Sequence, residues 1–141
     1  MLRSMMVGKL HGLRVTGADL HYEGSIALDP EHTEAAGILP HEFVEIWNKT
    51  TGARISTYVI PGPRGSRCCV LNGAAARTCQ VGDELIIAAR ATVAEKELCD
   101  FVSRTVTFCA ENRILRKIEH RLTNNSAGKW LLSASADSES D

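Results

Sequence analysis

Several common features are scarce or missing in this chain of 141 residues. No apolar run is long enough to cross a bilayer, and the opening segment MLRSMMVGKL has too short an apolar stretch for a signal peptide. The formal net charge is only -1 and aromatic residues make up only 5%, which argues against a nucleic-acid-binding protein. These absences predict a cytoplasmic protein.

The cysteines fit neither a disulfide framework nor a zinc site. There are five of them, an odd number, no CxxC occurs, and Cys68 and Cys69 are adjacent. We therefore expect buried thiols in a reducing compartment, and no metal. The chain also lacks internal repeats and the GxGxxG, Walker, HExxH and GxSxG motifs, so no common catalytic signature indicates its chemistry.

What the chain does contain is a series of short β-branched and aromatic stretches separated by turn residues. Hydrophobic residues make up 44% and charged residues 23%, which is typical of one globular domain with its own core. The expected strands cover residues 5–16, 25–28, 43–48, 53–60, 68–71, 85–91 and 103–108. Many short strands with little helix predict a mainly β fold, a small β-barrel with a few short helices.

Local signals mark the expected helices and turns. Asp29 and Pro30 form a helix start, and Gly37 ends that helix. The Asn-Gly pair at residues 72–73 predicts a turn, with the alanines after it beginning a short helix. Residues 18–20 resemble a further short turn.

The first expected strand has one uneven face. Lys9 and His11 share a side with Leu13 and Val15, because side chains alternate along a strand. A face that begins polar and ends apolar is typical of a strand whose start frays into solvent, and we expect fraying here.

A basic segment follows the last expected strand. Residues 113–121 contain Arg113, Arg116, Lys117, His120 and Arg121. This cluster could bind an anion, but the solvated face of a helix is the favoured interpretation. The Ser-, Ala- and Asp-rich end of the chain is typical of disorder.

A set of polar side chains lies within otherwise apolar, β-rich surroundings. Each has an ordinary structural explanation, and no rule of spacing assembles them into a site. The segment His21–Ile26, taken alone, is a turn built on a Gly-Ser pair. The set comprises Lys9, His11, Tyr22, Ser25, Trp47, Arg54, Thr57, Tyr58 and Asn72.

Several motifs in a fixed order give these residues a context. They are MLRSMMVGKLH, VTGADLHYEGS, TGARISTYVI, PGPRGS, LNGAAAR and VGDELIIAA. In this order the chain resembles the pyruvoyl-dependent aspartate 1-decarboxylase family. The resemblance predicts a family domain over residues 1–115 and a divergent, partly disordered C-terminal tail over residues 116–141.

The resemblance implies a double-psi β-barrel and a homotetramer with active sites at subunit interfaces. It also implies self-cleavage between Gly24 and Ser25, which converts Ser25 into a pyruvoyl group. That group would form a Schiff base with L-aspartate, and loss of CO2 would yield β-alanine for pantothenate biosynthesis. No metal is implied.

The resemblance also assigns roles residue by residue. Ser25 and Tyr58 match catalytic positions, Tyr58 as the proton donor. Positions that match substrate contacts are Lys9, Arg54, Thr57 and the backbone of Gly73, Ala74 and Ala75. Positions that match processing or support of the site are Tyr22, Gly24, His11, Trp47, Asn72 and Ile86.

Three alternatives stay open at this point. The substrate could be a related acidic amino acid such as glutamate, because Arg54 selects for a carboxylate without setting its distance from the reacting carbon. The chain could be an unprocessed β-barrel binding module. Processing could also require a maturation partner.

Overall fold

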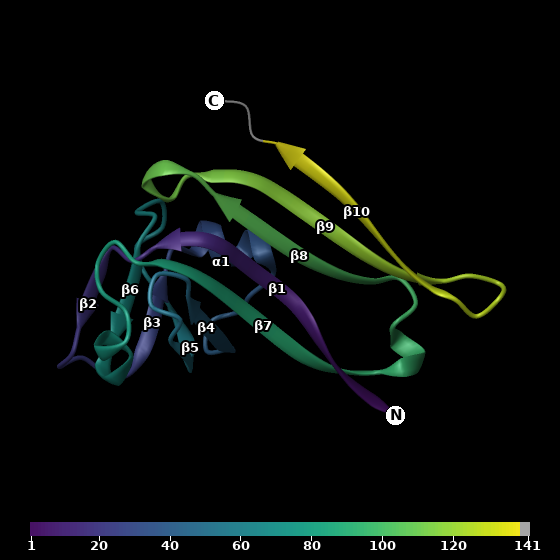
Figure 1. The fold of residues 1–141 in the computed structure, drawn as a ribbon, viewed down its shortest axis with the longest axis horizontal. Helices are drawn as coiled ribbons and strands as arrows, with labels where there is room; N and C mark the ends of the chain where they lie inside the picture. Colours follow the sequence, from purple (N-terminus) through teal and green to yellow (C-terminus); the bar gives the residue numbers. More distant parts are fainter. Residues whose placement is uncertain (139–141) are drawn as a thin grey trace.

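Ten strands form one hydrogen-bonded sheet in the computed structural model, which describes residues 1–138 (Figure 1). They are β1 (Leu2–Arg14), β2 (Gly17–Asp19), β3 (Ser25–Leu28), β4 (Phe43–Asn48), β5 (Arg54–Pro61), β6 (Cys69–Asn72), β7 (Glu84–Ala94), β8 (Phe101–Phe108), β9 (Ile114–Asn124) and β10 (Trp130–Ser138). Their order across the sheet is β10-β9-β8-β1-β7-β4-β5-β3-β6-β2. The helical elements of the described residues are α1 (Pro30–Ala36) and the short 3-10 helices η1 (Gly73–Arg77), η2 (Glu95–Glu97) and η3 (Ala110–Asn112). The predicted mainly β fold, a small β-barrel with short helices, is confirmed.

The hydrophobic core lies on one face of the strands that form the barrel. Leu10, Ile46 and Ile87 are fully buried and come from β1, β4 and β7, which are neighbours in the sheet. Ile26 and Leu71 extend this core from β3 and β6, where they are directly opposite each other. The alternation of buried and accessible residues along these strands leaves their second face free for polar chemistry.

A β-bulge explains the uneven face of β1. The register of β1 against β7 shifts between His11 and Leu13, and the intervening Gly12 has a φ of 87°, in the left-handed region that glycine tolerates. The extra residue turns Leu13 into the core, where it is fully buried, while His11 stays at an accessible position. The expected fraying is wrong: β1 begins at Leu2 and is paired with β7 from its first residue.

Helix α1 begins and ends where its sequence signals place it. The Asp29 carboxylate accepts a hydrogen bond from the Glu31 backbone N–H at 2.9 Å, and Gly37 ends the helix with a φ of 72°. Asp29 also accepts from the N–H groups of Gly65 and Arg67, at 3.0 and 2.7 Å. This buried carboxylate therefore ties the loop before β6 to the start of α1.

The C-terminal part of the described chain differs from the prediction. The basic segment forms strand β9, which pairs with β8, so the expected helical face is wrong. Strand β10 pairs with β9 as far as Ser138, and the two extend one edge of the sheet as a hairpin (Figure 1). Because β9 runs through residue 115 without a break, the sheet does not end at the predicted domain boundary. Residues 139–141 of the tail predicted to be partly disordered, residues 116–141, lie outside the described residues.

Two smaller predictions also need correction. Residues 17–19 form the short strand β2, paired with β6, so the turn expected at residues 18–20 is present only from Leu20 onward. Cys69 and Cys79 are buried as expected, but Cys99 and Cys109 are exposed. All five cysteines are free thiols.

Candidate active site

Ser25 is buried at the first position of β3, with its hydroxyl held between two partners. Only 1% of the residue is exposed. Its Oγ donates a hydrogen bond to the Glu23 carbonyl at 3.1 Å and accepts one from the Asn72 side-chain amide, also at 3.1 Å. Asn72 lies directly opposite Ser25 in the β3–β6 ladder and is itself buried. The hydroxyl is thereby folded back along the backbone that precedes it.

A glycine makes room for the turn before Ser25. Gly73 has a φ of 69°, and a Cβ atom at this position would lie 2.7 Å from Gly24 Cα and 3.1 Å from the Tyr22 carbonyl oxygen. No side chain fits there, because both neighbours are backbone atoms. Gly73 also begins η1, which carries Ala74 and Ala75. The predicted positions Tyr22, Gly24 and Gly73 therefore meet beside Ser25.

Tyr58 approaches this region from β5, whereas Thr57, the residue before it, points to the other face of that strand and lies opposite Val44 of β4. Strands β3 and β5 run parallel, with Ile26 opposite Val59. Ser25 and Tyr58 each precede that pair by one residue, so the register places them side by side. Tyr58 is half-buried, and the rings of His41 and Phe43 lie 5.4 and 6.1 Å from its own ring.

Most of the remaining predicted residues form one row on the outer face of the sheet. His11 is opposite Ile86 on β7, Ile86 is opposite Trp47 on β4, and Trp47 is opposite Arg54 on β5. Directly opposite residues in a sheet point to the same side. Lys9 belongs to the next row, opposite Ala88, so it shares this outer face.

The outer face presents an oriented cation. The Arg54 guanidinium stacks on the Trp47 ring, 4.9 Å from its centroid. Arg54 is exposed, and no hydrogen bond or ion pair links its guanidinium to another group within residues 1–138. A flat cation held by an aromatic ring and left with open N–H groups is suited to bidentate binding of a carboxylate.

His11 is an uncharged group on this cationic surface. Partial burial lowers its pKa, and the positive charges of Lys9 and Lys49 lower the pKa further, against the opposing effect of Glu84. Its Nδ1 is buried and has no hydrogen-bond partner in the described part of the chain. A neutral imidazole of this kind can accept a proton or a hydrogen bond from a bound molecule.

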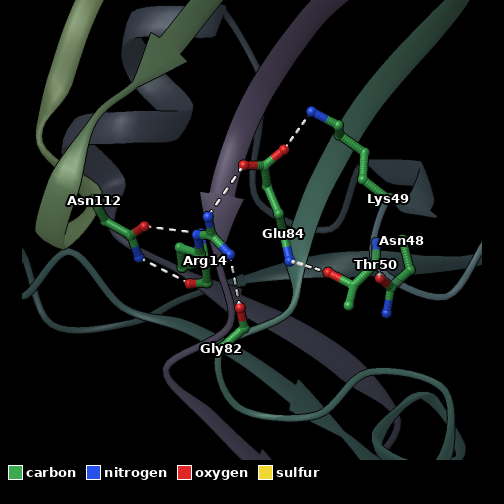
Figure 2. A network of polar contacts seen from close by, with 7 residues as sticks. All are labelled: Arg14, Asn48, Lys49, Thr50, Gly82, Glu84 and Asn112. Atoms are coloured by element: carbon green, nitrogen blue, oxygen red, sulfur yellow. Dashed lines mark hydrogen bonds and ion pairs between the residues drawn. The ribbon is translucent and has the colours of Figure 1, made fainter.

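A polar network braces the start of β7 close to His11 (Figure 2). Glu84 forms ion pairs with Lys49 and with Arg14, the latter at 3.4 Å. The Glu84 backbone N–H donates to the Thr50 hydroxyl at 3.0 Å. These contacts hold the β4–β5 turn and the end of β1 against the start of β7. They thereby help to position the side chains of the outer face.

Comparison with known proteins gives this arrangement a family. The model of the family described as aspartate decarboxylase matches residues 1–115. The chain belongs to this family. The predicted family and the predicted class of enzyme, a carboxy-lyase, are confirmed.

Individual members of the aspartate decarboxylase family match over most of their length. The aspartate 1-decarboxylase of Xanthobacter autotrophicus is 60% identical over 129 residues, which cover 92% of this chain and 86% of that protein. The aspartate 1-decarboxylases of Methylobacterium nodulans and Methylocella silvestris are each 57% identical over 129 residues, covering 92% of this chain and 85% and 83% of those proteins. An alignment of 129 residues extends past residue 115, so similarity continues into β9 and beyond. The division at residue 115 stays a prediction.

Against this family background, the structure brings the predicted residues together in two groups. The first group surrounds Ser25; the second, the outer-face group, comprises Lys9, His11, Trp47, Arg54 and Ile86. In the order of the sheet, β7, β4 and β5 lie between β1, which carries Lys9, and β3, which carries Ser25. Strand β5 carries both Arg54 of the outer-face group and Tyr58, and it pairs directly with β3.

Sequence reasoning missed residues next to this family site. Glu45 shares the row of Lys9 through Ala88 and forms an ion pair with Arg90. Its alternation with Trp47 along β4 was the available signal. The ring of His41 lies beside that of Tyr58, and no sequence pattern connected the two residues.

Two searches of residues 1–138 bear on metals and membranes. No group of three or more histidine, cysteine or acidic side chains is placed to hold a metal ion. No helix there has the length and apolar character needed to span a bilayer.

Proposed function

We propose that this protein converts L-aspartate to β-alanine and CO2, after cleaving its own chain between Gly24 and Ser25. The observation that carries the proposal is the buried Ser25 hydroxyl, held by Asn72 and directed to the Glu23 carbonyl. A serine placed for substrate chemistry alone would need to face a cavity. This one instead faces the backbone of the turn that precedes it.

Cleavage begins with attack of Ser25 Oγ on the Gly24 carbonyl carbon. The peptide bond is replaced by an ester, and the serine nitrogen becomes an amine. Loss of the Ser25 α-proton then expels the Gly24 carboxylate by β-elimination, and water releases ammonia to leave a ketone. The Asn72 side-chain amide hydrogen-bonds the attacking oxygen. Because Gly73 has no Cβ atom, the turn that contains Gly24 can lie against it. Tyr22 and Thr57 complete the proposed processing site.

The surroundings of residue 25 fit a small neutral group such as pyruvoyl. Its polar neighbours are an amide and a backbone carbonyl, and residue 25 is buried in the uncleaved chain. When present, this group supplies a ketone that captures the substrate amine and an adjacent carbonyl that accepts the electron pair left by CO2.

Substrate recognition then falls to the outer-face group. Arg54 binds the carboxylate that is retained, with Lys9 as a second cation on the same face. The N–H groups of the Gly73–Ala75 backbone contribute hydrogen bonds to the substrate. Tyr58, placed by register beside Ser25, donates a proton to the carbon that loses CO2.

We also propose that the enzyme is a homotetramer whose active sites form between subunits. The separation of Ser25 on β3 from Lys9 and His11 on β1, with β7, β4 and β5 between them in sheet order, supports this assembly. So does the exposed Phe43, of which 69% is accessible in the single chain. Five free thiols fit a cytoplasmic location, where the product would serve pantothenate biosynthesis.

Intact-mass measurement of the purified protein tests the processing step. We expect one fragment that ends at Gly24 and a second whose first residue is blocked as pyruvoyl. The Ser25→Ala variant should remain a single chain and have no activity. Cleavage that persists in Ser25→Ala, or a wild-type chain that stays intact after prolonged warm incubation, would contradict the proposal. Cleavage that appears only after addition of cell extract would indicate a maturation factor.

A product assay with aspartate and glutamate side by side tests the substrate. We expect β-alanine from aspartate and little γ-aminobutyrate from glutamate. The reverse preference would support the alternative substrate. An intact chain that binds acidic ligands without turnover would support a binding module.

A further inference from the structure

A cavity lies away from the Ser25 and outer-face groups. Its volume is about 360 Å³, and its walls come from the end of β1, the loop before β6 and the helix η3. The side chains that matter for its chemistry are Arg14, Ser66, Arg67 and Glu111, with Asn112 at its base. None of these residues has a part in the proposed reaction.

The walls of this cavity are held in an unfavourable backbone conformation. Arg67, Glu111 and Asn112 have φ values of 58°, 60° and 55°, in the left-handed region that non-glycine residues rarely adopt. Strain of this kind persists only where surrounding contacts enforce it, and it is common where a ligand is clamped.

Buried hydrogen bonds enforce this conformation. Asn112 is 2% exposed; its side chain accepts from the Arg14 backbone N–H at 2.8 Å and donates to the Arg14 and Arg67 carbonyls at 2.9 and 3.0 Å (Figure 2 shows its Arg14 contacts). Asp29 holds the Arg67 N–H from the other side of the loop. The position of residue 67 is therefore fixed before any ligand arrives.

Of the two arginines that line the cavity, only Arg67 has no partner for its guanidinium among the described residues. Arg14 is paired with Glu84, and Glu111 is paired with Arg113 at 3.2 Å. The Arg67 guanidinium, in contrast, forms no hydrogen bond or ion pair within residues 1–138. Among the side chains that line the cavity, Arg14 and Arg67 are cations and Glu111 is an anion, and the Asp29 carboxylate lies behind the loop on the Arg67 N–H. An open guanidinium favours a planar or tetrahedral oxyanion.

We propose that this cavity is a binding site for a small anion that carries a carboxylate or a phosphate, with Arg67 as its charged contact. The site is separate from the carboxylate contact at Arg54, and it does not depend on whether the chain cleaves itself. Strand β6 connects it to the active site, since Arg67 precedes β6 and Asn72 ends it.

Titration of the full-length protein tests the proposal. The probes are inorganic phosphate and acetate, each followed by calorimetry and by backbone amide NMR at constant ionic strength set with chloride. We expect saturable binding of at least one probe, with shifts at the amides of Gly65, Ser66 and Arg67. The probe that binds more tightly identifies the class of anion.

Three variants locate the binding. Arg67→Gln should raise the Kd about tenfold or more, the range expected for loss of a charged contact. Arg64→Gln removes the same charge from the same loop outside the cavity, and should bind like wild type. Arg54→Gln should also retain binding.

Two outcomes would overturn the assignment. One is equal weakening by Arg67→Gln and Arg64→Gln, which would indicate a nonspecific charge effect. The other is loss of binding in Arg54→Gln alone, which would place the anion on the outer face. Absence of saturable binding for both probes would refute the site altogether.

Discussion

At the scale of single residues, the Ser25 site depends on the absence of a Cβ atom at Gly73. Gly73 combines a left-handed backbone with a neighbour, Gly24 Cα, that a Cβ atom would approach to 2.7 Å. Gly52 has a similarly positive φ of 83°, but nothing lies within 4 Å of its Cβ position. A substitution at Gly52 therefore has only the cost of the left-handed backbone, whereas the same substitution at Gly73 adds the cost of a steric clash.

We predict that Gly73→Ala lowers thermal stability more than Gly52→Ala and also stops or greatly slows cleavage. The conformational cost, about 1 kcal/mol, is common to both. Only Gly73→Ala must displace the backbone that carries the scissile bond. Melting temperature and intact mass over time are the measurements. Equal melting temperatures together with normal cleavage in both variants would show that the close approach has no role.

His32 gives a second prediction at the residue scale. Only 3% of this residue is exposed, and burial lowers its pKa below the usual 6.5, against the attraction of Asp29 and Glu31. The unfolded chain therefore binds a proton at a higher pH than the folded chain does. The fold therefore keeps its full stability, as far as His32 is concerned, above about pH 6.5, and it loses stability as the pH falls below that value.

We expect His32→Gln to reduce the loss of melting temperature between pH 7 and pH 5, because the titrating group is gone. His21→Gln serves as the control, since His21 is exposed. Melting curves at several pH values measure the slope. If His32→Gln and wild type lose stability in parallel, His32 is not the group responsible.

At the scale of elements, Asp29 joins α1 to the loop before β6. Its carboxylate is fully buried and accepts three backbone hydrogen bonds, from Glu31, Gly65 and Arg67. Although burial opposes the effect, these three donors hold the pKa of Asp29 below its usual range. The same loop also contacts α1 through the exposed ion pair of Arg64 with Glu34.

We predict that Asp29→Ala destabilises the fold by about 3 kcal/mol, from loss of the helix cap and two further buried acceptor contacts. Asp29→Asn should cost less, because an amide oxygen still accepts. Glu34→Ala should leave stability nearly unchanged, as exposed ion pairs contribute little. Urea unfolding measures all three. An Asp29→Ala variant as stable as Glu34→Ala would contradict the role assigned to the carboxylate.

At the scale of the whole molecule, the proposed catalytic residues divide into two groups on one chain. Ser25 lies in β3, while Lys9 lies in β1 with three strands between them in sheet order. If the site forms between subunits, each complete site takes its groups from two chains.

Co-expression of Ser25→Ala with Arg54→Gln tests this arrangement. Each variant alone should be inactive, since one lacks the pyruvoyl precursor and the other the carboxylate contact. Mixed oligomers should regain up to about a quarter of wild-type activity, because random assembly gives that share of sites an intact pair. Co-expression of Ser25→Ala with the double variant is the control. No recovery in mixed oligomers of demonstrated composition would place both groups in the same subunit.

Much of the fold was predictable because its signals are local. The Asp29 cap, the Gly37 stop and the alternation along β4 and β5 depend on neighbouring residues only, and the structure has them where the sequence places them. The basic segment 113–121 was not predictable in this way. Its residues became a strand because β8 offers a partner, and such pairing overrides local preference.

The sequence by itself determined the family, through ordered motifs, and the residue types that the chemistry requires. It also determined which side chains share a face wherever a strand is regular. Only the tertiary structure decided where that regularity breaks, as at Gly12, and which distant residues meet, as Ser25 meets Asn72 and Gly24 meets Gly73. The physical reason is that hydrogen-bond register and close backbone contact join residues far apart in the chain, and no local pattern records them.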